Sequence, residues 1–432
     1  MKNMTFNLSL AAAKDRTPQD ILWHFPARLS LCLLVSGLFL QMPVALAQQQ
    51  ETPEKRLVMR EIVTQESPFG TYGSFEKLLQ AAEEGNADAQ AQVSICYGKG
   101  NGVTRDYGKA FTWAMKSAEQ GNAEGASIVA SCYLQGKGTR KDMPRAVEWL
   151  QKAASQGNAE AQNNLGAMYY YGAEGVSKDE KKAFPLFEKS ANQDDPDAQY
   201  NLGLMYYLGA EGVPQDEKKA FFWFEKSAKQ NHPDAQYYMG ACYSLGKGVK
   251  KDISQSFYWL EKSAEQGHPD AQDNLACLYF NDKDVQEILN QSSTLVFEKT
   301  KDQAQKLLQK EYSQIEPEVQ SKIEKMVYWF NKAAEQGVAR AQTNMGIFYI
   351  LGLGGLRMDI TKALEWWKKA AEQGDAEAQY ALGGCYSGET PYFKDIPQDI
   401  QESRKWFQKA ADQGHEGAKE TLERLFHIKA SS

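Results

Sequence analysis

A stretch of 36 or 37 residues recurs along most of this 432-residue chain, and it restricts the fold more than any other feature. Residues 196–231 show the stretch clearly. In the first half, Ala198, Leu202 and Tyr206 stand four residues apart, which places them on one face of a helix. In the second half, Trp223 belongs to a similar apolar stripe. The intervening GAEGVPQD offers glycines for a reversal and an aspartate to cap the second helix. The stretch therefore predicts a helical hairpin.

Eight copies keep one register. We call the residue equivalent to Ala198 the anchor of each repeat and number the repeats one to eight. The anchors follow one another in steps of 36, 36, 37, 37, 36, 70 and 37 residues, at Ala89, Gly125, Ala161, Ala198, Ala235, Ala271, Ala341 and Ala378. A tyrosine comes eight residues after every anchor, and a tryptophan marks the second half of seven repeats. A hairpin with two apolar faces needs neighbours, so the copies are expected to stack.

At these residues the chain resembles the Sel-one-like repeat (SLR) family, which is related to tetratricopeptide (TPR) repeats. The pattern A-x-A-Q-x-x-L-G-x-x-Y-x-x-G, then G-V-x-x-D and A-x-x-W-x-x-K-A-A-x-Q-G, stands at 159–209 and again at 376–414. The resemblance covers residues 74–426. It implies an all-α fold, an α/α superhelical solenoid of about eight helical hairpins with terminal capping helices. Members of the family act as adaptors in signalling, envelope or host-interaction complexes, which is what the resemblance implies about function.

The first 47 residues resemble an export signal. An apolar run, LSLCLLVSGLFLQMPVALA, follows basic residues and ends in a small-x-small motif, which predicts a signal peptide cleaved after Ala47. The long leading segment is atypical. The alternative is an uncleaved anchor at residues 29–47 in the inner membrane, because that run nearly spans a bilayer. Residues 48–73, rich in Gln and Glu, are expected to form a polar linker. These features favour a periplasmic or secreted protein.

The solenoid is expected to carry its own end covers. Residues 74–85 read as a lone second helix, residues 416–426 as a closing first helix, and residues 427–432 as a C-terminal tail. Repeat six contains an insertion at about 283–322. Its helical spacing favours a degenerate hairpin over a disordered loop, and a functional insert is the third possibility.

Composition argues against nucleic acid as a partner. The formal net charge is −7 and the pI is near 5.5, whereas nucleic-acid binding requires a concentrated basic face. Five cysteines follow the signal. Four of them, Cys96, Cys132, Cys242 and Cys385, share one packing position, so a core role is expected rather than disulfides. Cys277 is displaced by one residue, which makes it the thiol to test for reactivity.

Sequence motifs for catalysis, cofactors or metals are weak. His232, His268 and His415 take a turn position held by asparagine in other repeats, and they are expected to cap helices rather than bind a metal. Ser74-Phe75-Glu76-Lys77 matches the S-x-x-K motif of penicillin-recognising enzymes without its companion motifs. Because some cysteine-rich SLR proteins have been linked to β-lactams, a β-lactam-binding or hydrolysing enzyme is the alternative function. A helix cap explains Ser74 better, and we expect no enzyme, no cofactor and no metal.

A binding surface is expected where the packing positions leave side chains uncommitted. Residues two, six, nine and ten places after the anchor lie opposite the packed stripe of the first helix, and by resemblance to TPR proteins they line a concave groove. In repeats three to five this surface is rich in tyrosine and leucine, which suit a peptide or protein partner. The predicted protein-binding residues are Tyr170, Tyr171, Tyr200, Leu204, Tyr207 and Tyr237. The alternative is that some of these tyrosines pack against the neighbouring helix.

The sequence thus favours an exported protein–protein interaction scaffold or adaptor that binds a peptide or protein partner in its groove. The alternatives are the β-lactam enzyme and a membrane-tethered scaffold. Neither the partner, the pathway nor the oligomeric state follows from the residues.

Overall fold

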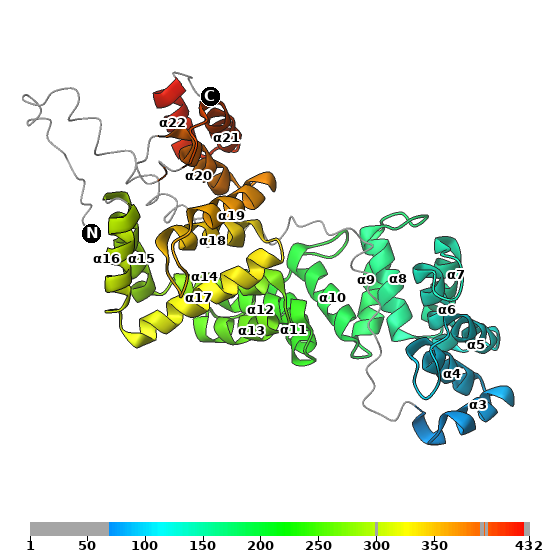
Figure 1. The fold of residues 1–432 in the computed structure, drawn as a ribbon. Coiled ribbons are helices and arrows are strands. Elements are labelled where there is room, and N and C mark those ends of the chain that lie inside the picture. The colour runs from blue at the N-terminus through cyan, green and yellow to red at the C-terminus, as the bar shows by residue number, and fades with distance from the viewer. Residues whose placement is uncertain (1–68, 299–300, 389–392, 394–395, 427–432) are drawn as a thin grey trace, which may run out of the picture. The chain divides into compact units, whose positions relative to one another are not determined.

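The computed structural model describes residues 69–298, 301–388, 393 and 396–426 (Figure 1). The described chain is all-α, and helices pair in sequence order as an α/α solenoid of hairpins, as predicted. Contacts divide it into two compact units, one ending at His268 and the other starting at Pro269, and each is described by itself. The expected signal, the tail at 427–432 and most of the linker lie outside the described residues. None of the described helices is both long and apolar enough to cross a membrane.

The first unit contains one short 3₁₀ turn and eleven helices among its described residues. In chain order they are η2 (Gly70–Tyr72), α3 (Phe75–Glu83), α4 (Ala87–Lys99), α5 (Tyr107–Glu119), α6 (Ala123–Gln135), α7 (Met143–Ser155), α8 (Ala159–Tyr171), α9 (Glu180–Ala191), α10 (Pro196–Leu208), α11 (Glu217–Lys229), α12 (Pro233–Leu245) and α13 (Ile253–Glu265). Repeats one to five are the pairs α4–α5, α6–α7, α8–α9, α10–α11 and α12–α13, and α3 packs against α4.

The second unit contains nine described helices. They are α14 (Pro269–Phe280), α15 (Lys283–Glu298), α16 (Lys301–Tyr312), α17 (Pro317–Glu335), α18 (Ala339–Leu351), α19 (Ile360–Glu372), α20 (Ala376–Ser387), α21 (Ile400–Asp412) and α22 (Glu416–Phe426). Repeat six pairs α14 with α17, so the insertion is the α15–α16 hairpin plus the first turns of a lengthened α17. Val285, Leu289 and Leu308 of the insertion are buried in the same core as Ile323, which makes the insertion a packed element.

Side-chain caps begin the helices where the sequence predicts them. Asp216 accepts hydrogen bonds from the backbone N–H groups of Lys218 and Lys219 at 3.1 and 3.0 Å, and the equivalent aspartates cap other second helices in the same way. These are Asp106, Asp142, Asp179, Asp252 and Asp359. Ser74 caps α3, since its Oγ accepts from Lys77 N at 3.4 Å. The turn glycine Gly209 has a φ of +75°, which permits the reversal between the helices.

A small residue on the first helix faces a large one on the second in most repeats. A Cβ added to Gly203 would lie 2.7 Å from the ring of Phe224, and one added to Gly346 would lie 2.3 Å from the indole of Trp367. In repeat two the difference in size is smaller, because Ala130 stands on the first helix and Leu150 on the second. The distance between the two helices of a hairpin is therefore set by this pair.

The recurrent tryptophan lies at the edge of the packed stripe of the second helix, where in most repeats it is partly buried against the core. The side chain that follows it is the buried one, as Phe224 follows Trp223. The ammonium group of a lysine three residues later covers the exposed indole face, at 4.1 Å for Lys116 over Trp113 and 4.3 Å for Lys369 over Trp366. Only Trp367 and Trp406 are buried among the described tryptophans.

Paired glutamines connect successive hairpins. Gln199 of α10 donates to the Ala191 carbonyl at the end of α9 (3.3 Å) and accepts from Gln230, at the end of α11 (2.9 Å). One buried amide thus joins three helices. The same pair recurs as Gln90–Gln120, Gln162–Gln193, Gln236–Gln266, Gln272–Gln336, Gln342–Gln373 and Gln379–Gln413. Repeat two is the exception, because Ala126 stands in place of the first glutamine and leaves Gln156 without it.

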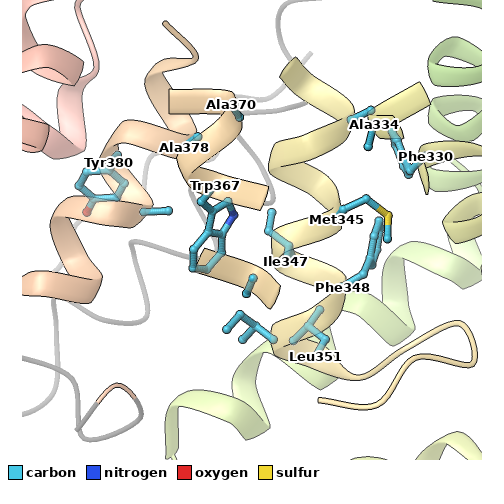
Figure 2. Close-up of a cluster of buried hydrophobic side chains, with 14 of the residues drawn as sticks. Phe330, Ala334, Met345, Ile347, Phe348, Leu351, Trp367, Ala370, Ala378 and Tyr380 are labelled. Carbon is cyan, nitrogen blue, oxygen red and sulfur yellow. The ribbon is translucent and has the colours of Figure 1, made fainter. Parts of the chain in front are cut away.

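The core of the second unit shows how the repeats interdigitate (Figure 2). The ring of Phe330 on α17 packs against that of Phe348 on α18 in a tilted arrangement, with centroids 5.7 Å apart. Trp367 of α19 is 2% exposed and donates from its indole N–H to the Thr343 carbonyl at 3.1 Å. Within this unit, α18 and α20 are therefore each packed between the second helix of their own hairpin and that of the one before.

Candidate protein-binding surface

The structure buries four of the six predicted binding residues. Tyr200, Leu204, Tyr207 and Tyr237 are 8%, 4%, 6% and 8% exposed. The expectation that they are exposed is therefore wrong, because successive first helices pack against each other on this side of the helix. The alternative raised from the sequence, packing against a neighbouring helix, describes these four.

The buried tyrosines belong to one aromatic cluster between repeats four and five. The ring of Tyr200 stacks on His232, with centroids 4.9 Å apart, and lies 5.8 Å from the ring of Tyr238. Tyr207 meets Tyr238 edge to face at 5.6 Å, and Lys247 Nζ donates to its hydroxyl at 3.1 Å. The cluster fixes the fourth and fifth repeats relative to each other within the first unit.

The residue ten places after the anchor stays accessible in repeats three to five. Leu208 is 46% exposed and Leu245 is 38% exposed, and Tyr171 occupies the same position one repeat earlier with partial exposure. Repeats one and two carry Lys99 and Gln135 there. We call Tyr171, Leu208 and Leu245 the apolar row. It follows the C-terminal ends of α8, α10 and α12, one side chain per repeat.

Tyr170 adjoins the apolar row. Its ring meets that of Tyr171 edge to face at 4.9 Å, and Lys178 Nζ lies 5.8 Å from its centroid. Of the six predicted residues, Tyr170 and Tyr171 are thus the two with partial exposure. The sequence argument did not select Leu208 and Leu245 above the rest of the surface. The missing signal was the crowding between first helices, which buries positions two and six after the anchor and leaves position ten.

Two of the three histidines predicted to cap helices, His232 and His415, do so in the structure. His232 Nδ1 accepts from Ala235 N at 3.2 Å, and His415 Nδ1 accepts from Ala418 N at 3.1 Å. Their other nitrogens face carboxylates on the preceding first helix: His232 Nε2 lies 3.0 Å from Asp197 and His415 Nε2 lies 3.2 Å from Glu377. Within the described residues, no three His, Cys, Asp or Glu side chains converge as metal ligands.

The five cysteines of the described chain are free thiols. Burial raises the pKa of Cys277 to about 12, outweighing the nearby Arg340. Burial likewise raises the pKa of Cys132 to about 11 and of Cys242 to about 12. Because the thiolate is the reactive form, these thiols are poor nucleophiles at neutral pH, and the displacement of Cys277 does not make it a reactive one.

Comparison with known proteins identifies the repeat. The family model described as Sel1 repeat matches residues 87–122, 123–158, 159–195, 196–232, 233–268, 323–338, 339–375 and 376–415. No curated protein matches the chain.

Two of the similar solved structures have sequences about 30% identical to this chain. A protective antigen of uropathogenic Escherichia coli strains, c5321, which displays an SLR fold, is 30% identical, with 82% of this chain and 76% of the antigen covered and a TM-score of 0.52. A Sel1 repeat protein from Oxalobacter formigenes is 31% identical over 47% of this chain and 80% of its own length, with a TM-score of 0.44.

Proposed function

Because this chain belongs to the Sel1 repeat family, we propose that it is a protein-binding scaffold that holds a polypeptide segment of its partner against the first helices of repeats three to five. Sel1 repeats generally mediate protein interactions. The single observation that carries the proposal is the apolar row. Leu208 and Leu245 are exposed at equivalent positions of successive repeats, next to the partly exposed Tyr170 and Tyr171.

The proposed contact is hydrophobic and repeats along the stack. Neighbouring helices lie about 8–10 Å apart, so one side chain per repeat suits an extended segment that places an apolar residue against every first helix. The buried tyrosines support the row rather than touch the partner. Replacing Tyr200, Tyr207 and Tyr237 with Ala would remove packed rings, which costs about 3–5 kcal/mol each in other cores, and would not isolate binding.

The test compares proteins captured from the native cell envelope by the wild type and by Leu208→Ser/Leu245→Ser. The matched control is Phe222→Ser/Ile253→Ser, which changes two equally exposed apolar residues, 49% and 43%, on second helices. We expect a partner, identified by mass spectrometry, to be lost with the first variant and retained with the second. The same proteins captured by both variants would reject the apolar row.

We propose a periplasmic or extracellular location, on the sequence argument for an export signal at residues 1–47 and on the antigen among the relatives. The N-terminal residue of the mature protein tests it, because cleavage after Ala47 leaves Gln48 first, whereas an uncleaved anchor retains residues 29–47.

We propose a non-catalytic role. Ser74 has the geometry of a helix cap, which supports this proposal over the β-lactam alternative. A nitrocefin assay of the purified wild type beside Ser74→Ala separates the two, and hydrolysis that disappears in the variant would establish the enzyme.

A further inference from the structure

A carboxylate stands one residue before the anchor in each repeat of the first unit. These residues are Asp88, Glu124, Glu160, Asp197 and Asp234. Three of them face a donor from the turn that precedes the next first helix: Asn122 Nδ2 donates to Asp88 at 2.6 Å, and His232 and His268 place Nε2 at 3.0 and 3.4 Å from Asp197 and Asp234. A carboxylate opposite a turn donor is thus the regular arrangement between repeats.

Repeat three breaks this arrangement. The turn residue opposite Glu160 is Asp195, a third carboxylate in place of an asparagine or histidine donor. Glu124, on the preceding first helix α6, is also close enough to act on Glu160. Within the described residues, neither Glu124 nor Glu160 forms an ion pair with a basic side chain. The regular donor is missing where negative charge is most concentrated.

The same place also lacks the stacked aromatic pair found in repeats four and five. Tyr200 and Tyr237 stand two residues after their anchors and stack on a turn histidine at 4.9 and 4.8 Å. Repeat two has Ser127 at that position and Asn158 in the turn. Ser127 is 2% exposed, its Oγ lies beside the Glu160 carboxyl, and it has no well-formed hydrogen-bond partner. A buried hydroxyl left in this way is costly unless something else contacts it.

A second unpaired polar group lies in the same region. Asn164 of α8 is 8% exposed, and its Nδ2 donor has no hydrogen-bond partner. One repeat later, the equivalent Asn201 donates to Asn163 on the preceding helix at 2.9 Å. By this register Asn164 lies next to Ser127, so an acceptor and a donor are both unsatisfied there.

The second unit shows what completes an equivalent joint. There the turn before repeat eight holds Asp375, at the position equivalent to Asp195. Arg340 stands one residue before the anchor of repeat seven. Arg340 donates to Asp273 and Asn274 of the preceding first helix, and its charge also acts on Asp375. Asp273 is the counterpart of Ser127, and Arg340 that of Glu160. In this joint the guanidinium group of Arg340 binds the polar side chains of the preceding first helix and brings a positive charge near the turn aspartate.

We propose that the acidic site formed by Glu124, Ser127, Glu160 and Asp195 binds the arginine side chain of a partner segment. The fork of five N–H donors on a guanidinium group can bridge carboxylates on neighbouring helices, which an ammonium group does less well. Asn164 Nδ2 suits a backbone carbonyl of the same segment. This inference rests on the proposed scaffold function and adds the charge of the partner to it.

The ionisation of the site agrees with a cationic ligand. Burial, together with the carboxylates of Asp195, Glu124 and Asp197, raises the pKa of Glu160 to about 7, and a hydrogen bond from Ser127 acts in the opposite direction. Burial and Asp88 also raise the pKa of Glu124. An arginine would favour the charged form of both, so its binding is expected to strengthen as the pH rises from 6 to 8. His232 lies beside Asp197, one of the carboxylates that act on Glu160.

The experiment uses the full chain and no natural partner. Saturation-transfer NMR would measure binding of N-acetyl-arginine amide, with N-acetyl-lysine amide, the neutral isostere N-acetyl-citrulline amide and calcium chloride at matched ionic strength as the other probes. We expect arginine to bind most tightly and citrulline not to bind. Tighter binding of calcium, equal binding of citrulline or no binding at all would overturn the proposal.

Two variants locate the effect. Glu160→Gln should weaken arginine binding at least about tenfold, the size of one charged hydrogen bond, while Asp234→Asn, at the equivalent and already paired position, should leave it unchanged. Ser127→Tyr/Asn158→His copies the Tyr200–His232 pair and should fill the site. Equal weakening by Asp234→Asn would overturn the assignment. Because these probes do not touch the apolar row, arginine binding and partner capture through Leu208 and Leu245 can fail independently.

Discussion

At the scale of single residues, the width of each hairpin depends on one contact. Gly203 lets the ring of Phe224 lie directly on the backbone of α10, and Gly383 does the same for Phe407 in repeat eight. A methyl group at Gly203 would lie 2.7 Å from the ring of Phe224, so either the ring or the helix would have to shift. The alternation of small and large side chains in the repeat is therefore a packing requirement.

Gly203→Ala should destabilise the protein by about 1–3 kcal/mol through overpacking. Gly203→Ala/Phe224→Leu should recover most of the loss, because it copies the Ala130–Leu150 pair of repeat two. Urea unfolding of the two single variants and the double variant gives the coupling energy. Additive effects would show that the two residues do not act as a pair.

A second residue-scale prediction concerns Glu160, whose pKa burial raises from 4.5 to about 7. Between these values the folded chain holds a proton that the unfolded chain has lost, so stability falls as the pH rises from about 4.5 to about 7 and stays lower above it. The loss is at most about 3 kcal/mol, less because the side chain is partly exposed. Glu160→Gln should remove it. The stability gained by the variant, from urea unfolding, should therefore be larger at pH 8 than at pH 5, and an equal gain at both would contradict the assignment.

At the scale of helices, the glutamine pair joins each hairpin to the one before. Gln199→Ala removes one hydrogen bond to the Ala191 carbonyl and one from the Gln230 amide. Each group keeps a second partner around Asp194, so we expect a cost of about 0.5–1.5 kcal/mol per bond lost. The repeats supply their own control. Gln156→Ala should be close to neutral, because Ala126 already stands where its partner would be. Hydrogen exchange at the end of α9 should report the first change, and a similar loss for Gln156→Ala would disprove the role of the pair.

The spacing of alanines, tyrosines and capping aspartates was enough to predict the helices, because those rules act within a few residues. The burial of a side chain by the helices of the next repeat was harder to predict. Tyr200 and Tyr237 looked uncommitted on a single helix, yet the next helix along covers them. Trp223 looked like core, yet its neighbour Phe224 is the buried ring. A helical wheel gives the faces of one helix, whereas exposure depends on the distance to the neighbouring helix, which Gly203 helps to set.

At the scale of the molecule, each compact unit needs an end cover. In the second unit, α22 buries Ala418 and Leu422 in the core that contains Tyr380 and Phe407. Leu422→Asp should lower the stability of this unit by about 2–5 kcal/mol, as for other losses of a buried leucine, and should increase binding of a hydrophobic dye. The exposed Glu423→Ala is the matched control. Equal dye binding by the two variants would show that α22 does not act as a cover.

The partly buried tryptophans determine how unfolding of this protein can be monitored by tryptophan fluorescence. Six of the eight described indoles are only partly buried in the folded state, so their emission should change less on unfolding than that of an enclosed indole. Trp367 of repeat seven and Trp406 of repeat eight are enclosed and should contribute the largest red shift on denaturation. The emission wavelength in a melt should therefore weight the second compact unit most. Unfolding of repeats one to five should be followed better by circular dichroism.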